Sequence, residues 1–349
     1  MQSQIVENHQ NEEVQNVPSS DVSHVLRASA IGFGGFALLY LLFLGIYLRF
    51  PYLRPGDNLV ATMKHDTARN GNFFKSAQGE RIHVVAFGYS KMLSGFRPDL
   101  FDSQMAAGGF ATESYNFGLP GDSKFVSDLE AMAAHGTAPD IALLTFPWPS
   151  TPPPGPTFFH FINNDQELME ELFPFHHLPR NLFILAVQAH SLRRMPEVYE
   201  EDKQSVFQVA KDRGYYFISR QSHYPHDELP PTLRLPTDKP QELSPRVVTL
   251  GPVYEQLATA LAQHKIKCLL IPNYFRDGEF ALPPTPNPQT ARVLEGQPNV
   301  AVVGPDYWLY ANRLFSDPEH ANRPGAVTYT KDVADLVTGW LKQQKAAQQ

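Results

Sequence analysis

A long apolar run near the start of the chain is the clearest feature in the pattern of hydrophobic and polar positions. Residues 28–48 contain no charged side chain over 21 positions, and Arg27 and Arg49 flank them. A helix of this length rises about 31 Å, which matches the hydrocarbon thickness of a bilayer. Ala28 to Leu48 are therefore predicted to form one transmembrane helix, with aromatic anchors at its far end, namely Tyr47, Phe50 and Tyr52.

The segments on either side of this span set its expected topology. Residues 1–27 form a polar, acidic stretch without periodicity, which is typical of a disordered tail. No small-residue cleavage site follows the span, so a retained anchor is favoured over a cleaved signal peptide. More basic residues follow the span than precede it (Arg49, Arg54 and Lys64 against Arg27), which favours a cytoplasmic C-terminal part.

After a juxtamembrane connector at residues 49–80, short apolar runs alternate with amphipathic segments. Strands are predicted at 82–87, 111–118, 140–146, 266–272 and 300–305, and helices at 90–105, 123–136, 253–265 and 331–344. This alternation is typical of an α/β domain in which a mainly parallel sheet is covered by helices on both faces, a three-layer sandwich. The domain is assigned to residues 81–349, with an insertion at about 157–250 that breaks the alternation and contains one predicted helix at 181–195.

Composition narrows the class of protein. The chain has 29 Lys and Arg against 36 Asp and Glu, a formal charge of −7, which argues against nucleic acid as a partner. Its single cysteine, Cys268, excludes an intramolecular disulfide and lies in an apolar strand, where a small core residue is expected. No metal or other cofactor is expected, because no zinc-ligand spacing relates the clustered histidines 176, 177, 223 and 226.

The strand predicted at 82–87 ends in Gly88-Tyr89-Ser90. Sites in parallel sheets form at the carboxyl ends of strands, so Ser90 is a candidate nucleophile. The same residues also fit an ordinary strand-to-helix turn, because glycine permits a tight turn and serine often begins a helix.

A second motif, "NFGLPGDS" at residues 116–123, follows the next predicted strand. Glycine at 118 and 121 frees the backbone to turn an N–H inward, where it can stabilise a developing oxyanion. The alternative is a plain helix start, with Asp122 or Ser123 as the N-cap.

A third motif lies before the last predicted helix, in "SDPEHANRPGA". Asp317 and His320 are three positions apart, so one helical or 3₁₀ turn places both side chains on one face. A carboxylate beside an imidazole sets its tautomer and supports the imidazolium that forms when the base takes a proton. Alone, this motif also fits a surface turn with a solvated histidine.

Taken in this order, the three motifs resemble the SGNH/GDSL hydrolase family. "NFGLPGDS" is similar to the second block of that family, and "DPEHANRPGA" is similar to its last block, including Asn322 and Gly325-Ala326. The opening "GYSKMLSGFRPDLF" resembles a membrane-anchored SGNH-like subgroup that includes the D-alanine-transfer and alginate-acetylation proteins. The resemblance covers residues 82–146 and 253–343 and implies an SGNH/flavodoxin-like fold.

The resemblance also implies a role for each site residue. Ser90 would be the nucleophile, His320 the general base and then acid, and Asp317 the group that orients it, while the N–H groups of Ser90 and Gly121 would form the oxyanion hole. Two positions depart from the family pattern. Tyr89 stands where the family usually has Asp or Ser, and no Asn follows the third strand, so the candidates for that donor are Thr145, Ser150 and Asn163-Asn164.

The resulting expectation is a single-pass, membrane-anchored SGNH-like serine esterase or O-acyltransferase. Its substrate would be an acyl ester of a cell-surface glycan or lipid, with a membrane-bound O-acyltransferase as a partner. The anchored subgroup implies an extracytoplasmic catalytic domain, which we favour over the opposite orientation suggested by the flanking charges. The alternative is an inactive scaffold or binding subunit of a cell-envelope glycan modification complex, because the third-block Asn is missing.

Overall fold

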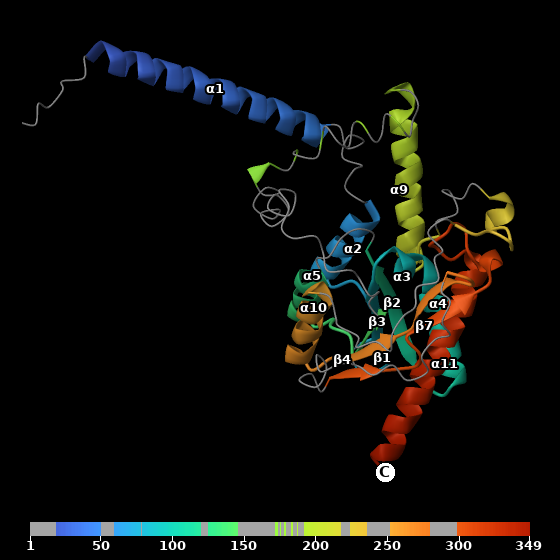
Figure 1. The fold of residues 1–349 in the computed structure, drawn as a ribbon. Helices are drawn as coiled ribbons and strands as arrows, with labels where there is room; N and C mark the ends of the chain where they lie inside the picture. Colours follow the sequence, from blue (N-terminus) through green and yellow to red (C-terminus); the bar gives the residue numbers. More distant parts are fainter. Residues whose placement is uncertain are drawn as a thin grey trace, which may run out of the picture.

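The computed structural model describes most of the α/β part of the chain. The described residues are 19–49, 59–77, 79–119, 125–145, 192–217, 224–235, 252–279 and 299–349, together with single positions between 172 and 187. Figure 1 shows a body in which helices surround a central sheet, with one long helix extending away from it. The predicted α/β class is therefore confirmed.

The main sheet has five strands in the order β2-β1-β3-β4-β6, and every pairing is parallel. Its strands are β1 (Ile82–Gly88), β2 (Thr112–Gly118), β3 (Ile141–Thr145), β4 (Lys267–Ile271) and β6 (Val300–Val302). Gly88 pairs with Gly118 at the carboxyl ends of β1 and β2, so the turns that follow these two strands start side by side.

Two short strands form a separate parallel pair, β5 (Asn273–Arg276) with β7 (Tyr307–Tyr310). The prediction that 300–305 is the last strand is wrong, because β7 follows it. Both strands have only four residues: "NYFR" follows β4 after Pro272, and "YWLY" follows Gly304-Pro305-Asp306. A pattern so short carries little information about where one strand ends and the next begins.

Side chains of β1 alternate between two buried clusters, as expected for neighbouring residues of a strand. Val85 and Phe87 belong to one cluster, and Val84 and Ala86 to the other. The first cluster includes side chains of α2 (Leu59–Arg69), α5 (Phe125–Ala134) and α10 (Pro252–Gln263). The second includes side chains of α3 (Ser90–Gly95), α4 (Pro98–Ala107) and α11 (Arg323–Ala347). Cys268 lies fully buried in the first cluster, as predicted.

Helix α2 lies within the segment that we expected to be a connector, yet it belongs to the core. Nδ1 of His65 lies 2.8 Å from the Asp128 carboxylate of α5. Nζ of Lys64, which is fully buried, donates a hydrogen bond of 2.7 Å to the carbonyl oxygen of Gly118. The α/β body therefore begins before residue 81, because these polar contacts and the small side chains of α2 attach it to α5 and β2.

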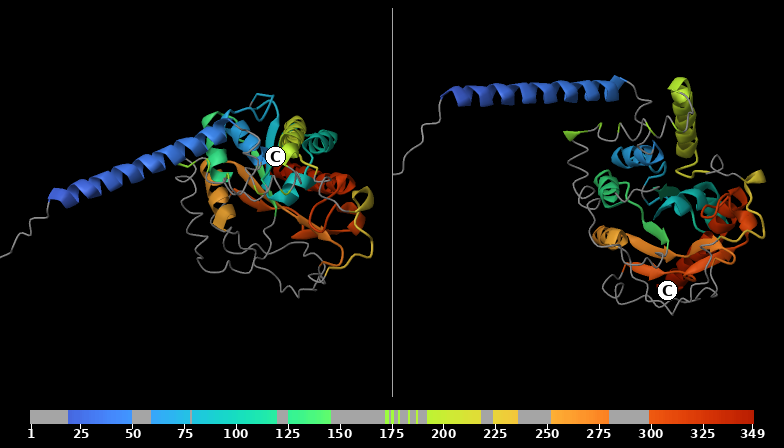
Figure 2. Two further views of the ribbon diagram at one scale, coloured as in Figure 1. Left: turned by 90° about the horizontal axis from the view of Figure 1, so that it is seen from above. Right: turned by 45° about the horizontal axis from the view of Figure 1, so that its top comes forward.

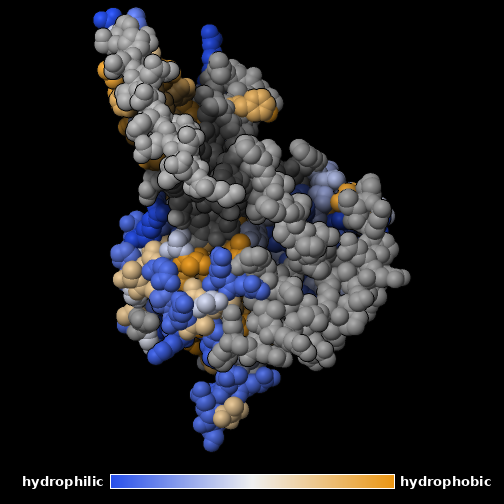
Figure 3. Space-filling model, turned by 60° about the vertical axis from the view of Figure 1, so that its left-hand side comes forward, coloured by the Kyte–Doolittle hydropathy of each residue, from blue (hydrophilic) through white to orange (hydrophobic). Residues whose placement is uncertain are grey.

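Helix α1 (Ser19–Arg49) contains the predicted span and begins ahead of Ala28. Among the described residues it is the one helix long and apolar enough to cross a membrane. Both views in Figure 2 show it extending away from the α/β body. In Figure 3 apolar side chains reach the surface at the upper left, where this helix comes forward, whereas the end of α11 at the bottom is hydrophilic.

Part of the 157–250 insertion is described, and it docks on the α/β body. Helix α9 (Met195–Lys211) was not predicted, and most of the helix expected at 181–195 lies outside the described residues. The N–H of Asn116 donates to the carbonyl oxygen of Arg213 at 2.9 Å, and the N–H of Tyr216 donates to that of Leu93 at 3.1 Å. Three short 3₁₀ turns complete the described elements: Leu192–Arg194, Pro225–Asp227 and Asn312–Leu314.

Candidate active site

Ser90 lies where the sequence predicts it, at the carboxyl end of a buried strand. Strand β1 ends at Gly88, Tyr89 is extended with φ −94° and ψ −156°, and Ser90 is the first residue of α3. The first N–H groups of a helix have no acceptor within the helix, and the N–H of Ser90 is one of them. Ser90 is partly exposed and lies at the carboxyl edge of the sheet rather than in the core.

The two paired glycines explain how α3 comes so close to the strands. A Cβ at Gly88 would lie 2.7 Å from Cβ of Met92, and a Cβ at Gly118 would lie 2.4 Å from the backbone N of Leu93. Neither glycine has a positive φ, so both are needed for space rather than for an unusual backbone conformation. Gly88 and Gly118 therefore allow α3, the serine helix that begins at Ser90, to pack directly on β1 and β2.

Asn116 of the second motif holds the other end of α3. Its Nδ2 donates to the carbonyl oxygens of Met92 at 2.8 Å and Phe96 at 2.7 Å, and its Oδ1 accepts the N–H of Gly118 at 2.9 Å. The side chain is fully buried. Because these bonds occupy its amide, Asn116 supports the position of the serine helix and has no free donor for a substrate.

Asp317 and His320 form the pair that the spacing predicts. Nδ1 of His320 lies 2.8 Å from Oδ2 and 3.0 Å from Oδ1 of Asp317. Oδ1 also accepts the N–H groups of Glu319 and His320, which closes a tight turn. Partial burial alone would raise the pKa of Asp317, but the hydrogen bonds from the His320 ring and from these N–H groups lower it. The pair therefore keeps a charged carboxylate against the ring.

The other ring nitrogen of His320 is in an unusual state. Nε2 is buried and has no hydrogen-bond partner among the described residues. In a neutral ring whose Nδ1 donates to the Asp317 carboxylate, Nε2 is the nitrogen that carries the lone pair. Buried polar atoms are normally satisfied, so an unpaired Nε2 indicates a group poised to accept a hydrogen bond.

The loop that carries this pair is fixed on both sides. Phe315 and Ala321 form an antiparallel bridge, and the N–H of Ser316 donates to the carbonyl oxygen of His320 at 2.9 Å. Nε of Arg276, from β5, donates to the carbonyl oxygen of Pro318 at 2.8 Å. The Asp317–His320 turn is thus held by a strand that the sequence pattern did not predict.

Tyr274 of β5 links this loop to the serine turn. Its hydroxyl donates to the carbonyl oxygen of Lys91 at 2.9 Å and accepts the N–H of Ala321 at 3.3 Å. Lys91 follows Ser90 and Ala321 follows His320, so one buried phenol contacts the immediate neighbours of both candidate residues. No hydrogen bond joins Ser90 Oγ to His320 among the described residues.

Lys91 is a further charged group in this region that sequence reasoning missed. Its Nζ lies 3.7 Å from the ring centroid of Phe275 and donates to the carbonyl oxygen of Tyr274 at 3.2 Å. Burial lowers the pKa of Lys91 to about 8, although nearby carboxylates, including Glu319 and Asp317, oppose the change. Its position next to the candidate nucleophile was the one signal available in the sequence.

The oxyanion donors are described only in part. Gly121, Ser150 and Asn163-Asn164 lie outside the described residues, as do His176, His177 and His223. Thr145 is buried at the end of β3, and its Oγ1 would lie 3.8 Å from a Cβ at Gly88, beside the serine turn. Its hydroxyl also bonds to Tyr254. No group of three or more potential metal ligands occurs within the described part of the chain.

Comparisons with known proteins add no assignment. A scan against protein-family models, a search of curated proteins and a search of solved structures found no significant match to this chain.

Proposed function

We propose that the protein is a membrane-anchored SGNH-like serine esterase or O-acyltransferase that acts on acyl esters of a cell-surface glycan or lipid. The observation that carries the proposal is the Asp317–His320 pair, with Nδ1 bonded to the carboxylate and Nε2 buried and unpaired. The arrangement fits a general base whose tautomer is set by its carboxylate. The Tyr274 bridge supports Ser90 as its partner, because one hydroxyl contacts both of the segments concerned.

In the proposed reaction, Ser90 Oγ attacks the acyl carbonyl carbon while His320 Nε2 takes the hydroxyl proton. The N–H groups of Ser90 and Gly121 stabilise the oxyanion of the tetrahedral intermediate. Its collapse breaks the ester bond, and the imidazolium returns the proton to the leaving alcohol, which leaves an acyl ester on Ser90. Water or an acceptor hydroxyl then resolves this ester by the reverse steps, giving hydrolysis or acyl transfer.

The setting of the site is part of the proposal. The two buried clusters, which share the strands but take side chains from different helices, support a three-layer SGNH-type sandwich. The exposed, apolar α1 supports a single-pass anchor. On the resemblance to the anchored subgroup, we propose that the α/β domain is extracytoplasmic and works with a membrane-bound O-acyltransferase. A reporter fused after Gln349 that is active only in the cytoplasm contradicts this orientation.

A second candidate is an inactive scaffold subunit of a glycan modification complex. Two observations favour it: Ser90 Oγ makes no hydrogen bond to His320 among the described residues, and no Asn follows β3. Losing one oxyanion donor typically costs about 10²–10³ in rate. Hydrogen bonds in unliganded sites are often long and tighten when substrate binds, so the first observation does not exclude an enzyme.

Covalent labelling distinguishes the two candidates. The full chain, purified in nonionic detergent, is treated with a fluorophosphonate and examined by intact mass and peptide mapping. We expect an adduct on Ser90 that is lost in Ser90→Ala and His320→Ala and kept in Ser103→Ala, a control at an exposed serine of α4. Absence of an adduct from protein that melts cooperatively contradicts the enzyme and favours the scaffold.

A further inference from the structure

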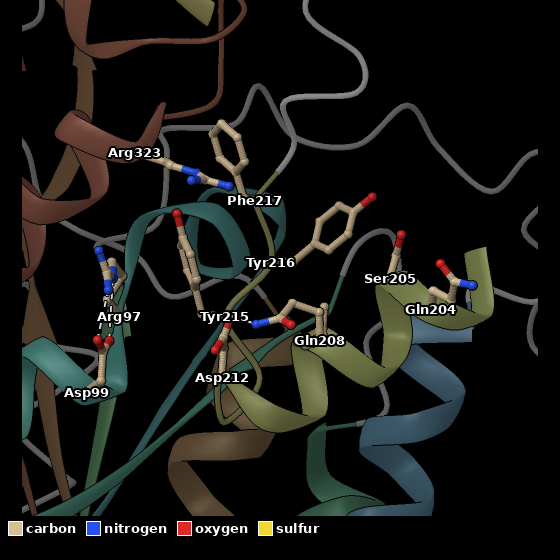
Figure 4. A pocket seen from close by; sticks show the side chains of 11 residues that line it. Arg97, Asp99, Gln204, Ser205, Gln208, Asp212, Tyr215, Tyr216, Phe217 and Arg323 are labelled. Carbon is tan, nitrogen blue, oxygen red and sulfur yellow. Dashed lines mark hydrogen bonds and ion pairs between the residues drawn. The ribbon is translucent and has the colours of Figure 1, made fainter. Parts of the chain in front are cut away.

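A cavity of about 650 Å³ lies between the docked insertion and the rest of the α/β body. Helix α9 and residues 215–217 line one side of it, and Arg97, Asp99 and Arg323 line the other. In Figure 4 these side chains come from α9 and the segment after it, from α4 with its N-cap Arg97, and from the start of α11. The proposed reaction uses none of these residues.

The hydroxyl of Tyr215 is the central feature of this cavity. The side chain is only 8% exposed, and its hydroxyl is buried without a hydrogen-bond partner among the described residues. The guanidinium carbon of Arg97 lies 5.7 Å from the centroid of the Tyr215 ring. In Figure 4 the hydroxyl points toward the guanidinium of Arg323, and the guanidinium of Arg97 lies beside the ring. A buried hydroxyl beside two guanidinium groups needs an acceptor, and the described residues supply none.

Arg323 has no carboxylate partner among the described residues. Its guanidinium lies over the ring of Phe217 at 4.5 Å, a contact that orients the group without using its N–H donors as hydrogen-bond donors. Arg97 does have a partner, since its Nη2 lies 2.7 Å from Oδ2 of Asp99. That carboxylate is 62% exposed, and ion pairs so open to solvent are weak and easily exchanged for another anion.

Acidic side chains also line the cavity, but they lie away from the hydroxyl. In Figure 4 the carboxylates of Asp99 and Asp212 are at the opposite end of the Tyr215 ring from its hydroxyl. Oδ2 of Asp212 accepts a hydrogen bond of 2.9 Å from Nε2 of Gln208. The guanidinium of Arg323 and the hydroxyl of Tyr215 therefore lie at one end of the cavity, and the guanidinium of Arg97 lies between that end and the Asp99 carboxylate.

We propose that this end of the cavity binds a phosphate group through Arg97, Arg323 and the hydroxyl of Tyr215. A phosphate has enough acceptor oxygens for three donors that approach from different elements, whereas a carboxylate offers two oxygens in one plane. Guanidinium groups suit such oxyanions because they remain charged and present several N–H donors. The group is part of a soluble phosphate ester or of a lipid headgroup, and both sources present the same chemistry.

The cavity adjoins the candidate active site along the chain. Arg323 is three positions after His320, and the N–H of Tyr216 bonds to Leu93 of the serine helix. We place the bound phosphate on the acyl substrate or on the acceptor of the Ser90 reaction, and this step rests on the proposed function. Phosphate binding itself does not.

Calorimetric titration with inorganic phosphate at constant ionic strength tests the site in the full chain in nonionic detergent. We expect saturable binding that weakens about 10- to 100-fold in Arg323→Gln and in Arg97→Gln, as expected for losing a charged hydrogen bond. Tyr215→Phe keeps the ring and should weaken binding less. Lys345→Gln removes the same charge at the far end of α11 and should bind like the unmodified chain. No saturable binding, or equal affinity in Arg323→Gln and Lys345→Gln, overturns the proposal.

Two further measurements identify whether the phosphate belongs to a soluble ester or to a lipid headgroup. They also separate the phosphate-site proposal from the proposed serine enzyme. If the natural ligand is a lipid headgroup, phosphatidylglycerol in nanodiscs should compete with inorganic phosphate and lower its apparent affinity. If the natural ligand is a soluble phosphate ester, the affinity for inorganic phosphate should be the same in nanodiscs as in detergent. Both results support the site. Fluorophosphonate labelling is measured on the same samples. Phosphate binding without labelling rejects the serine enzyme and keeps the cavity, and labelling without phosphate binding does the reverse.

Discussion

The hydroxyl of Tyr274 donates a 2.9 Å hydrogen bond to the carbonyl oxygen of Lys91, a residue 183 positions away in the sequence. The same oxygen accepts the N–H of Ala321, so the position of the His320 turn relative to the Ser90 turn depends on one side chain of β5. The phenol is fully buried and is surrounded by aromatic rings that include Phe315 and Tyr329. It is therefore a rigid spacer between the two halves of the candidate site.

Removing this hydroxyl should affect both positioning and stability. In Tyr274→Phe the buried N–H of Ala321 loses its acceptor, which should lower the free energy of unfolding by about 1–3 kcal/mol. A shift of the His320 turn should also slow labelling of Ser90 about 10-fold or more, because small displacements of catalytic groups are costly. Tyr115→Phe removes a buried phenol in the other core cluster and should leave the labelling rate unchanged. Equal labelling rates in both variants contradict the spacer role.

The Asp317 carboxylate should contribute to stability in a defined range of pH. Its pKa is lowered by the His320 ring and two N–H groups, against the opposing effect of burial. Its contribution is therefore complete above the pKa of an unfolded Asp, about 3.9, and is lost as the pH falls through the folded value. The free energy of unfolding should be measured with denaturant between pH 2 and 6. At pH 6 it should be larger for the unmodified chain than for Asp317→Asn, and this difference should shrink as the pH falls. A difference that does not change with pH contradicts a charged, hydrogen-bonded carboxylate.

Lys91 should likewise make the free energy of unfolding rise with pH, but over an alkaline window. Burial lowers its pKa to about 8 in the folded chain, so the unfolded chain binds more protons between pH 8 and its ordinary pKa of about 10.4. Stability should rise with pH over that window, by at most about 3 kcal/mol. Lys91→Met keeps the contact with Phe275 and removes the titration, so its profile should lack this rise. Parallel profiles in the two proteins indicate that Lys91 titrates normally.

The glycine at the end of β2 should be far less tolerant of substitution than a glycine in the last helix. A Cβ at Gly118 would lie 2.4 Å from the backbone N of Leu93, so Gly118→Ala must displace the serine helix. We expect a loss of about 2–4 kcal/mol, in the range of severe packing defects, together with loss of labelling at Ser90. Gly339→Ala meets nothing within 4 Å in α11 and should stabilise by up to about 1 kcal/mol. If the melting temperatures of Gly118→Ala and Gly339→Ala shift in the same direction, the result contradicts this packing.

Much of the sheet could be predicted because its strands are continuous apolar runs. Strands β2, β3, β4 and β6 lie within the predicted segments, β1 extends one residue past its predicted end, and Ser90 begins a helix one residue after β1. The Asp317–His320 contact was also predictable, since three positions in one turn place two side chains together without help from the rest of the fold. These features depend on near neighbours in the chain, and local pattern is a good guide to them.

The arrangement of the site depends on contacts that the sequence pattern does not record. Strands β5 and β7 escaped prediction because they are four residues long, yet β5 supplies Tyr274 and Arg276, the side chains that hold the His320 loop. Lys91 was missed because a lysine after a serine has no distinctive pattern until burial lowers its pKa. The packing of α2, α9 and residues 213–217 around the site was likewise decided by contacts between segments far apart in the chain. Secondary structure and the carboxylate–imidazole pair follow from local sequence. The approach of that pair to Ser90, and the cavity beside the site, are set by tertiary packing. Both depend on side chains that become neighbours only when the chain folds.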